Sequence, residues 1–378
     1  MTSSSFRPDY VDHFLHAGHF LEEVLDEKGM KQVDLAKRTG LTTKTINAII
    51  QGRAPLTPDT AYALELVFPD KPAITWIELE TAFQAERALQ KQNENLESHV
   101  NILKDFPIDT MVASGWINRK ESNVERLREL LKFFGVANVS QLEPVWENLS
   151  GMYRQSEAYS KEKLHIIAWL RQGERLANEI HCKPYSVDAF KSVIQECRKL
   201  THKPFDIVKK ELPTICSKAG VAVVFVKEIG KTRTTGAARW VKDKAIIQLS
   251  LRGKRNDIFW FTFFHECGHI LLHGKKGNFI DGQKNEKASA DNEYYYAFDN
   301  KKREAEADQF AQDVLFPRKE LDMFVNSAAI NSFSEDQITT FANAINVSPG
   351  LVLGHLQHRG LMPYPCSMNS KFKLKYEF

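Results

Sequence analysis

The sequence contains two histidines and a glutamate at a spacing that suits metal chemistry. His265, Glu266 and His269 form a His-Glu-x-x-His motif inside an apolar run. Four residues make about one turn of an α-helix, so both imidazoles are expected on one helix face, where their neutral nitrogens can bind one Zn²⁺. Glu266 would then lie beside the metal as the general base toward an attacking water. This is the chemistry of a zinc-dependent hydrolase.

The helix that positions these side chains is expected over residues 258–273. Asp257 precedes it as the expected N-cap, and Gly274 follows it as a helix terminator. At 1.5 Å per residue this helix would be about 24 Å long. Apolar residues surround its axis, which predicts that the helix is buried.

The third metal ligand has to come from another part of the chain. His273 is eight residues beyond His265, about 12 Å along the helix axis, which is too far to share an ion whose ligand atoms lie about 2 Å away. Leu272 and Lys275 stand where the metzincin pattern has a glycine and a third histidine. A carboxylate ligand is therefore expected.

The segment over residues 304–311, Glu-Ala-Glu-Ala-Asp-Gln-Phe-Ala, is the best source of this carboxylate. Glu304 and Asp308 are four residues apart and share one face of the expected helix. We predict that Glu304 binds the metal and that Asp308 accepts a hydrogen bond from the other ring nitrogen of a metal-bound histidine. Glu306 is the alternative third ligand.

Two other features lie near the motif. Cys267 lies roughly 200° around the helix from His265, so it is interpreted as a packed thiol rather than a ligand or redox switch. Residues 275–302 are polar and are expected to form a loop. Its three consecutive tyrosines, residues 294–296, are interpreted as packing anchors, and the alternative is that a hydroxyl stabilises a tetrahedral oxyanion.

At these residues the chain resembles the ImmA/IrrE family of zinc metallopeptidases. The family pattern is His-Glu-x-x-His, then Glu-x-x-Ala-Asp/Asn-x-Phe-Ala, then an apolar stretch that ends in proline, here Val314-Leu315-Phe316-Pro317. The resemblance covers residues 215–320. It implies action on regulatory proteins, or coupling to DNA-binding repressors, rather than general proteolysis. It also implies a gluzincin-like site with His265, His269 and Glu304 as ligands and Glu266 as base.

A second motif lies near the N-terminus, over residues 32–47. Its pattern is typical of a DNA-binding helix-turn-helix, in which Ala36 permits close helix packing and Gly40 forms the turn. Thr42 suits the N-cap of the second helix. The residues expected in the core are Leu35, Leu41, Ile46 and Ile49.

The candidate DNA-binding residues lie on and around the second helix. From Lys28 to Arg53 there are six basic residues and one acidic residue, so positive charge is concentrated where DNA would lie. The alternative is a three-helix protein-interaction domain with a solvated basic face. The side chains predicted to enter the major groove are Thr43, Lys44, Thr45 and Asn47, and those predicted to meet phosphates are Gln32, Lys37 and Arg53. Thr42, at the N-cap, is also counted among the DNA-binding residues.

Residues 18–70 resemble the Xre-type domain of HigA antitoxins, including the stretch Gly-Arg-Ala-Pro-Leu-Thr-Pro-Asp-Thr-Ala at residues 52–61. The resemblance implies binding to an operator in double-stranded DNA. One recognition helix alone offers little affinity, and such domains usually pair to match two half-sites. A homodimer is therefore expected.

The overall composition limits the remaining possibilities. A chain of 378 residues with 43% hydrophobic residues can fill two or three domain cores, and its net charge of +3 means that any DNA partner depends on local charge. No apolar stretch approaches the roughly 18 residues that span a bilayer, and the N-terminus is not a signal peptide. Five scattered cysteines without a Cys-x-x-Cys pair argue against a disulfide framework and against a cysteine zinc knuckle. A cytoplasmic protein without membrane contact is expected.

Together these patterns predict a mainly helical α+β protein with a small, mostly antiparallel sheet before the zinc helix. The strands are expected over residues 221–226, 237–241 and 245–249. An alternating Lys/apolar run at residues 371–376 predicts a last edge strand. The predicted domains are an N-terminal helix-turn-helix domain (1–80), a helical connector (81–210), a zincin-like domain (211–325) and a C-terminal helical extension (326–378).

The predicted function is that of an antitoxin-like or repressor-like transcriptional regulator. It would bind its operator and hydrolyse a peptide bond in one specific regulatory protein, such as a toxin or a repressor. The alternative is a non-catalytic antitoxin or repressor whose zinc domain binds a partner or senses a signal.

Overall fold

The computed structural model describes residues 16–150, 161–229, 234–274, 279–280, 292–328 and 332–377. The chain divides into two compact units, Met1–His99 and Val100–Phe378. Among the described residues, no helix is both long and apolar enough to cross a membrane. The fold is α+β and mainly helical, as predicted.

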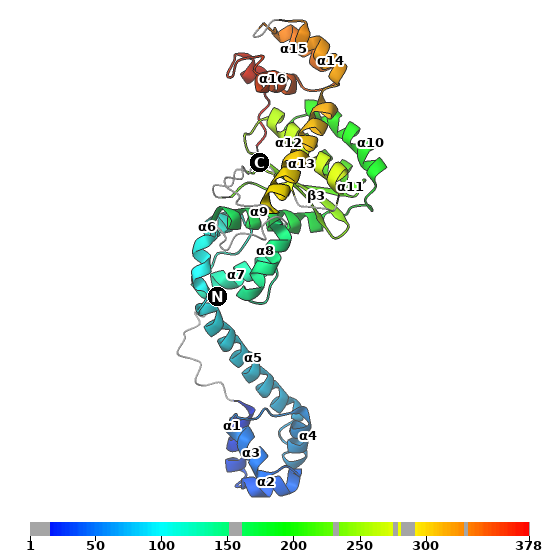
Figure 1. The fold of residues 1–378 in the computed structure, drawn as a ribbon. Coiled ribbons are helices and arrows are strands. Elements are labelled where there is room, and N and C mark those ends of the chain that lie inside the picture. Colours follow the sequence, from blue (N-terminus) through cyan, green and yellow to red (C-terminus); the bar gives the residue numbers. More distant parts are fainter. Residues whose placement is uncertain are drawn as a thin grey trace. The chain divides into compact units, whose positions relative to one another are not determined.

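The described part of the N-terminal unit, from residue 16 on, is all-helical (Figure 1). Leu35, Ile46 and Ile49 are buried in its core together with Trp76, and Leu41 packs against them half-buried, so the predicted core residues are confirmed. Gly40 ends the second helix with a φ of 74°, a left-handed conformation that glycine adopts without a Cβ penalty. The helices are α1 (Ala17–Glu27), α2 (Gln32–Thr39), α3 (Thr43–Ile50), α4 (Pro58–Val67) and α5 (Ala73–Glu97).

The second unit begins with helices that precede the sheet. Their ends follow ordinary capping chemistry: Ser122 accepts a hydrogen bond from the Glu125 amide at the start of α7, and Gly135 ends that helix in the left-handed conformation. These elements are η2 (Val100–Asp105), α6 (Ile108–Ala113), α7 (Asn123–Phe134), η3 (Val139–Gln141), α8 (Leu142–Ser150), α9 (Lys161–Glu179), α10 (Val187–Arg198), η4 (Lys199–His202) and α11 (Phe205–Ser217).

A four-stranded sheet follows in the order β1-β3-β2-β4. β1 (Val221–Phe225) runs parallel to β3 (Lys244–Leu249), whereas β2 (Gly236–Val241) is antiparallel to both β3 and β4 (Phe279–Ile280). The predicted strands are thus present, and the sheet is mostly antiparallel as expected.

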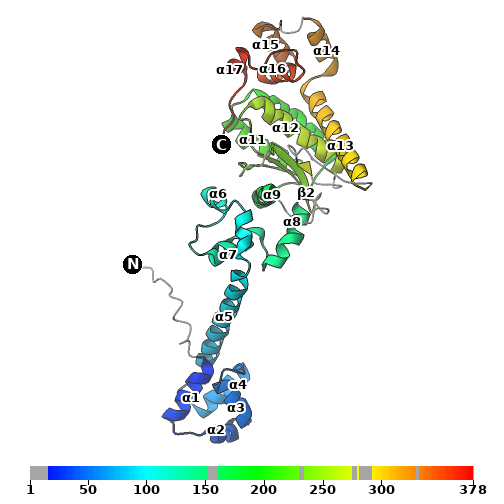
Figure 2. The same ribbon diagram turned by 60° about the vertical axis from the view of Figure 1, so that its left-hand side comes forward.

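One face of this sheet packs against α12 (Asn256–Gly268), which carries the His-Glu-x-x-His motif. Val223, Ala238 and Ile247 lie on this face and share a core with Trp260 and Phe263 of α12. The helix continues as the π-helix η5 (His269–His273), and α13 (Asn292–Leu315) packs against α12 (Figure 2). This face therefore holds the motif.

The opposite face of the sheet is covered by α9 (Figure 2). Arg239 of β2 is buried, and its guanidinium donates to the carbonyl of Leu170. On β3, Nε2 of Gln248 donates to the carbonyl of Trp169 over 2.7 Å. Because buried polar groups are costly unless they are hydrogen-bonded, these bonds fix α9 on the sheet.

The C-terminal helices join the same hydrophobic core as α12. They are α14 (Arg318–Asn326), α15 (Glu335–Ala344), α16 (Pro349–His358) and α17 (Met368–Phe372). Leu321, Ile338 and Leu353 are buried in this core. These helices are therefore packed onto the motif-bearing part of the chain rather than folded on a core of their own.

The C-terminal edge strand predicted from the Lys/apolar alternation is wrong. Phe372 instead ends the short helix α17, and only an isolated bridge pairs Arg255 with Lys375. The physical reason is the burial of Tyr376, whose hydroxyl accepts from Nε1 of Trp260 and donates to the carbonyl of Lys203, each over 3.1 Å. The segment after α17 is thus held by the buried side chain of Tyr376 and not by the hydrogen bonds of a β-ladder.

The predicted N-cap of the motif helix is also wrong. Arg255 occupies the N-cap, and Asp257 lies inside the first turn. Its carboxylate accepts two hydrogen bonds from the Arg255 guanidinium, over 2.9 and 2.8 Å, and pairs with Nζ of Lys373 at 2.9 Å. Because both cations engage this carboxylate, it is not available to cap the helix. A carboxylate in the first turn still complements the helix dipole.

Candidate metal centre and nucleic-acid interface

The site is built where α12 and α13 pack closely together. A Cβ at Gly268 would lie 3.1 Å from Cα of Ala307 and 3.2 Å from a ring carbon of Phe310, so glycine permits the close approach of the two helices. Ala307 is fully buried in this contact. The same face of α13 carries Glu304 one turn before and Asp308 directly after it, and both carboxylates are brought to α12.

Three side chains converge at this contact with atoms suited to bind a metal. Nε2 of His265 lies 2.9 Å from Nε2 of His269 and 3.3 Å from Oε2 of Glu304. Nε2 of His269 lies 3.5 Å from Oε1 of Glu304. Two ligand atoms of a tetrahedral zinc ion, each about 2 Å from it, lie roughly 3.3 Å apart. These distances therefore fit one shared ion.

Asp308 lies on the outer side of the histidine pair. Its Oδ1 is 2.8 Å from Nδ1 of His265. A carboxylate at this distance holds the proton on Nδ1 and leaves Nε2 with a lone pair for a metal. The structure thus places Asp308 beside Nδ1 of His265, as the sequence predicts. This is the ring nitrogen that points away from His269 and Glu304.

The charges of the converging groups suit a cation. Burial disfavours ionisation of Glu304, but the close contacts with the imidazoles of His265 and His269 outweigh it and lower its pKa to about 2. Burial lowers the pKa of His269 despite the nearby Glu304 carboxylate. Ionised carboxylate and neutral imidazole are the forms that bind zinc. The donor set of two nitrogens and one carboxylate oxygen matches that of catalytic zinc sites.

Glu266 is fully buried beside the histidines, between α12 and the start of β2. Its neighbour there is Gly236, where a Cβ would lie 2.6 Å from Oε1 of Glu266. It would also lie 2.6 Å from Cγ2 of Thr262. The sequence analysis missed Gly236, and its only signal was a glycine at the first position of a strand.

The remaining sequence candidates lie outside the cluster. Nε2 of His273 is 3.2 Å from the carbonyl of Arg303, and its Nδ1 is 3.8 Å from Glu306. Glu306 thus faces His273 and not the candidate metal position between His265 and His269. Cys267 is fully buried in the core, where burial raises the pKa of its thiol.

The three tyrosines at residues 294–296 belong by backbone to α13, which begins at Asn292, so the loop predicted over residues 275–302 is wrong in its second part. A helix there continues the segment that carries Glu304. The side chains of these tyrosines lie outside the described residues.

The two helices of the helix-turn-helix motif are α2 and α3. Thr42 is the N-cap of α3, as predicted, and accepts a hydrogen bond from the amide of Thr45 over 3.1 Å. Thr43 and Lys44 are exposed in the first turn, and Asn47 is half-buried one turn further on. The N-terminal turns of α3 are therefore accessible to a ligand.

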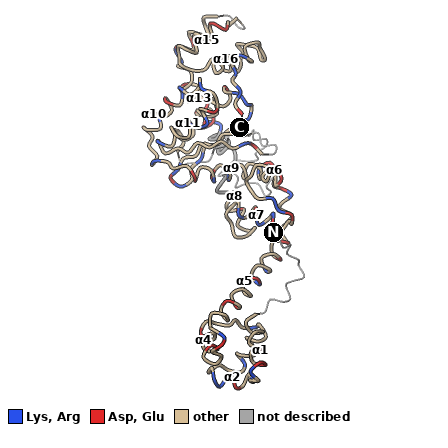
Figure 3. Tube along the Cα trace, turned by 180° about the vertical axis from the view of Figure 1, so that it is seen from behind, with Lys and Arg blue, Asp and Glu red and all other residues tan. Residues whose placement is uncertain are grey.

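Some of the predicted DNA-binding side chains are engaged within the protein. The hydroxyls of Thr42 and Thr45 lie 2.8 Å apart, and the Arg53 guanidinium donates to Oδ1 of Asn47 over 3.4 Å. Lys37 lies 3.9 Å from Asp34 on the exposed surface of α2. Figure 3 shows residues of both charges on the tube around α2. Among the residues predicted to contact bases, Lys44 carries a charge, and its side chain is exposed.

Comparison with known families agrees with this geometry. Residues 21–72 match the family described as Helix-turn-helix, and residues 216–353 match the peptidase family described as the IrrE N-terminal-like domain. The second match contains both the histidine motif and Glu304. No curated protein matches the chain.

Two regions of the chain are therefore similar to known domain families, the first to a helix-turn-helix family and the second to a peptidase family. These two domains indicate a DNA-binding regulator with a protease-like regulatory domain. The carboxylate that completes the three candidate metal ligands, Glu304, belongs to α13, which lies inside the second matched region.

Proposed function

We propose that this protein is a transcriptional regulator that binds an operator through α3 and hydrolyses a peptide bond in one specific regulatory protein. The observation that carries the proposal is the convergence of His265, His269 and Glu304 within 4.8 Å, with Glu266 buried beside them. A structural histidine pair would not need this third ionised ligand or the adjoining base.

Zinc held by the three ligands would supply a Lewis acid that activates water and polarises the substrate carbonyl. Glu266 accepts the proton of the attacking water and passes it to the leaving amine. Asp308 holds the proton on Nδ1 of His265 and so fixes the orientation of that ring. The buried surroundings of Glu266 strengthen each of these electrostatic interactions.

The DNA-binding part of the proposal rests on the helix-turn-helix match and on the exposed first turn of α3. Lys44 offers a charged donor to base edges, and Thr43 is exposed beside it. Lys37 and Arg53, both exposed, are proposed to meet phosphates, as is Gln32. The operator would lie in the protein's own or a neighbouring promoter.

We also propose that the protein binds DNA as a homodimer. Tyr62 and Leu66, one turn apart on α4, expose 62% and 85% of their surface, which is high for large apolar side chains. A second copy docked there would cover them and give the two recognition helices that a palindromic operator needs. Light scattering should show a dimer that Leu66→Glu converts to a monomer, whereas Met323→Glu, at another exposed large apolar residue, in the other unit, should not.

The substitution Glu266→Gln tests the peptidase activity. The amide keeps the shape of the side chain but cannot accept the proton of the attacking water. Cells that express the wild-type chain or Glu266→Gln, together with the proteins of the neighbouring genes, would be compared by mass spectrometry of new peptide termini. We expect one cleaved protein in the wild type, none with Glu266→Gln, and equal zinc content in both.

The same comparison separates the proposal from a non-catalytic regulator. If promoter regulation by Glu266→Gln equals that of the wild type and no protein is cleaved in either case, the metal domain recognises a partner without cutting it. A wild-type chain purified at neutral pH without zinc would contradict the metal site itself.

A further inference from the structure

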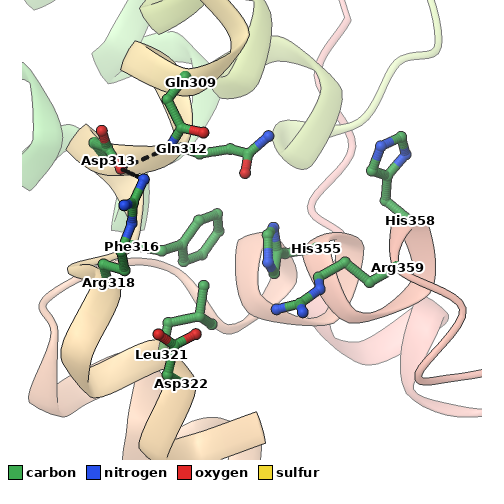
Figure 4. Close-up of a pocket in the computed structure, with 10 residues that line it drawn as sticks. All are labelled: Gln309, Gln312, Asp313, Phe316, Arg318, Leu321, Asp322, His355, His358 and Arg359. Atoms are coloured by element: carbon green, nitrogen blue, oxygen red, sulfur yellow. Dashed lines mark hydrogen bonds and ion pairs between the residues drawn. The ribbon is translucent and has the colours of Figure 1, made fainter.

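A cavity of about 480 Å³ lies between the end of α13, the start of α14 and the end of α16 (Figure 4). This volume falls in the range of small-molecule sites. The cavity is separate from the candidate metal centre, since neither the histidine pair nor Glu304 lines it. Its polar residues also do not form a metal-binding group among the described residues. A small organic ligand is therefore the relevant class of occupant.

The floor of the cavity is apolar. Phe316 and Leu321 are buried, and the Phe316 ring lies with its centroid 4.5 Å from that of the His355 imidazole. Nε2 of His355 is buried and has no hydrogen-bond partner among the described residues. Burial, with a contribution from Arg359, lowers the pKa of His355 to about 4, so the ring is neutral at pH 7 and does not repel a cation. This floor can accept an aliphatic side chain with a polar group beside it.

One ion pair in the wall of the cavity is already satisfied within the protein. Arg318 lies 3.7 Å from Asp313, and Asp313 also accepts from Nε2 of Gln309 over 2.8 Å. Figure 4 shows this group on the side of the cavity formed by α13 and α14. These side chains therefore have little charge left to offer a ligand.

Two opposite charges in the wall are not satisfied in this way. Neither the Asp322 carboxylate nor the Arg359 guanidinium has a hydrogen bond or an ion pair within the part of the chain that the structure describes. Asp322 projects from α14, and Arg359 follows α16 on the other side of the cavity (Figure 4). They do not pair with each other, so one cavity holds a separated carboxylate and guanidinium.

We propose that this cavity binds a zwitterionic ligand, an amino acid or short peptide with free ends and an aliphatic side chain. Its ammonium group faces Asp322, its carboxylate faces Arg359, and its side chain lies on Phe316 and Leu321. The guanidinium matches the planar geometry of a carboxylate. The orphaned Nε2 of His355 gains a polar group of the ligand as a partner.

Isothermal titration calorimetry on the full chain tests this proposal with L-leucine and leucyl-leucine as probes. We expect at least one of them to bind with a Kd of about 1 mM or tighter, and N-acetyl-leucinamide, which lacks both charges, to bind at least about tenfold more weakly. Absence of binding by both zwitterions would overturn the proposal. So would equal binding of the blocked compound, because the apolar floor alone would then explain the affinity.

Variants locate the binding within the cavity. Asp322 and Arg359 are exposed, so Asp322→Asn and Arg359→Gln should leave the fold intact, which circular dichroism would verify. Each should weaken binding of the zwitterion by about tenfold. Arg318→Gln is the matched control, because its guanidinium is already paired with Asp313. Equal losses in Arg318→Gln and Arg359→Gln would place the ligand elsewhere and refute the assignment.

Discussion

A Cβ at Gly236 would lie 2.6 Å from Oε1 of Glu266, so the backbone of β2 directly adjoins the carboxylate of the candidate base. Contacts this short do not occur between a Cβ and another heavy atom, and one partner would have to move. Glu266 is fully buried and surrounded by α12 and the sheet. The glycine therefore leaves the space that this carboxylate occupies.

Gly236→Ala is expected to lower kcat for the substrate found in the Glu266 comparison by about 100-fold, with KM little changed, because it displaces a general base. Zinc content should stay at that of the wild type, since the three atoms nearest to a Cβ at Gly236 belong to Glu266 and Thr262 and not to a metal ligand. Steady-state kinetics and metal analysis measure both.

The control for this substitution uses Thr262, the second group that the new methyl would meet. Thr262→Ser in the Gly236→Ala background removes the methyl at Cγ2, which lies 2.6 Å from the position of the added Cβ. It should recover thermal stability but not cleavage, because the contact with Glu266 remains. Wild-type kcat in Gly236→Ala would show that this glycine does not position the base.

Glu304 and Glu306 form a natural test of the third ligand. They are two residues apart on α13, yet Glu304 faces both histidines of the motif and Glu306 lies 3.8 Å from His273. Glu304→Gln should lose the bound zinc on dialysis, because an ionised ligand is removed. Glu306→Gln should keep about one zinc per chain. The reverse result would make Glu306 the ligand.

For the recognition helix, Lys44→Ala combined with Asn47→Ala should weaken operator binding by about 1–3 kcal/mol for each base contact that is lost. Both side chains lie on the accessible turns of α3. A gel-shift titration at fixed salt measures the change. The matched control is Lys91→Ala with Gln92→Ala, at exposed positions of α5 that remove the same charge away from α3. Equal affinity of both double variants would exclude α3 as the DNA reader.

The pKa of His355 predicts a pH dependence of stability. Burial lowers this pKa from 6.5 to about 4. Between pH 6.5 and pH 4 the imidazole of the unfolded chain therefore binds a proton that the folded chain does not bind. The free energy of unfolding should therefore fall as the pH drops from 6.5 to 4. Arg359 and His358 contribute to the lowered pKa, and the carboxylates of Asp313 and Asp322 line the same cavity.

Urea unfolding at pH 7 and pH 5 checks this dependence by comparing variants. His355→Gln should lose less stability between the two pH values than the wild type, because its amide does not titrate. His358→Gln, on the same helix but exposed, should keep most of the wild-type pH dependence, because burial is the largest cause of the lowered pKa of His355 and His358 contributes less. An unchanged pH dependence in His355→Gln would show that other groups cause it.

Sequence reasoning succeeded wherever the structure depends on residues close together in the chain. The spacing of His265 and His269 fixes their common face because the helix has a regular period. The same holds for Gly40 and Thr42, whose turn and cap depend on a few neighbouring bonds. It failed at the start of α12, where Arg255 and the distant Lys373 engage the carboxylate of Asp257.

The sequence by itself thus determined the two motifs, their helices and the kind of chemistry that they offer. Only the tertiary structure decided which groups surround the motif. The approach of α13 at Gly268 brings Glu304 and Asp308 to the histidines, and the register of β2 places Gly236 against Glu266. These contacts join residues far apart in the chain and depend on how buried surfaces pack, which no local pattern encodes.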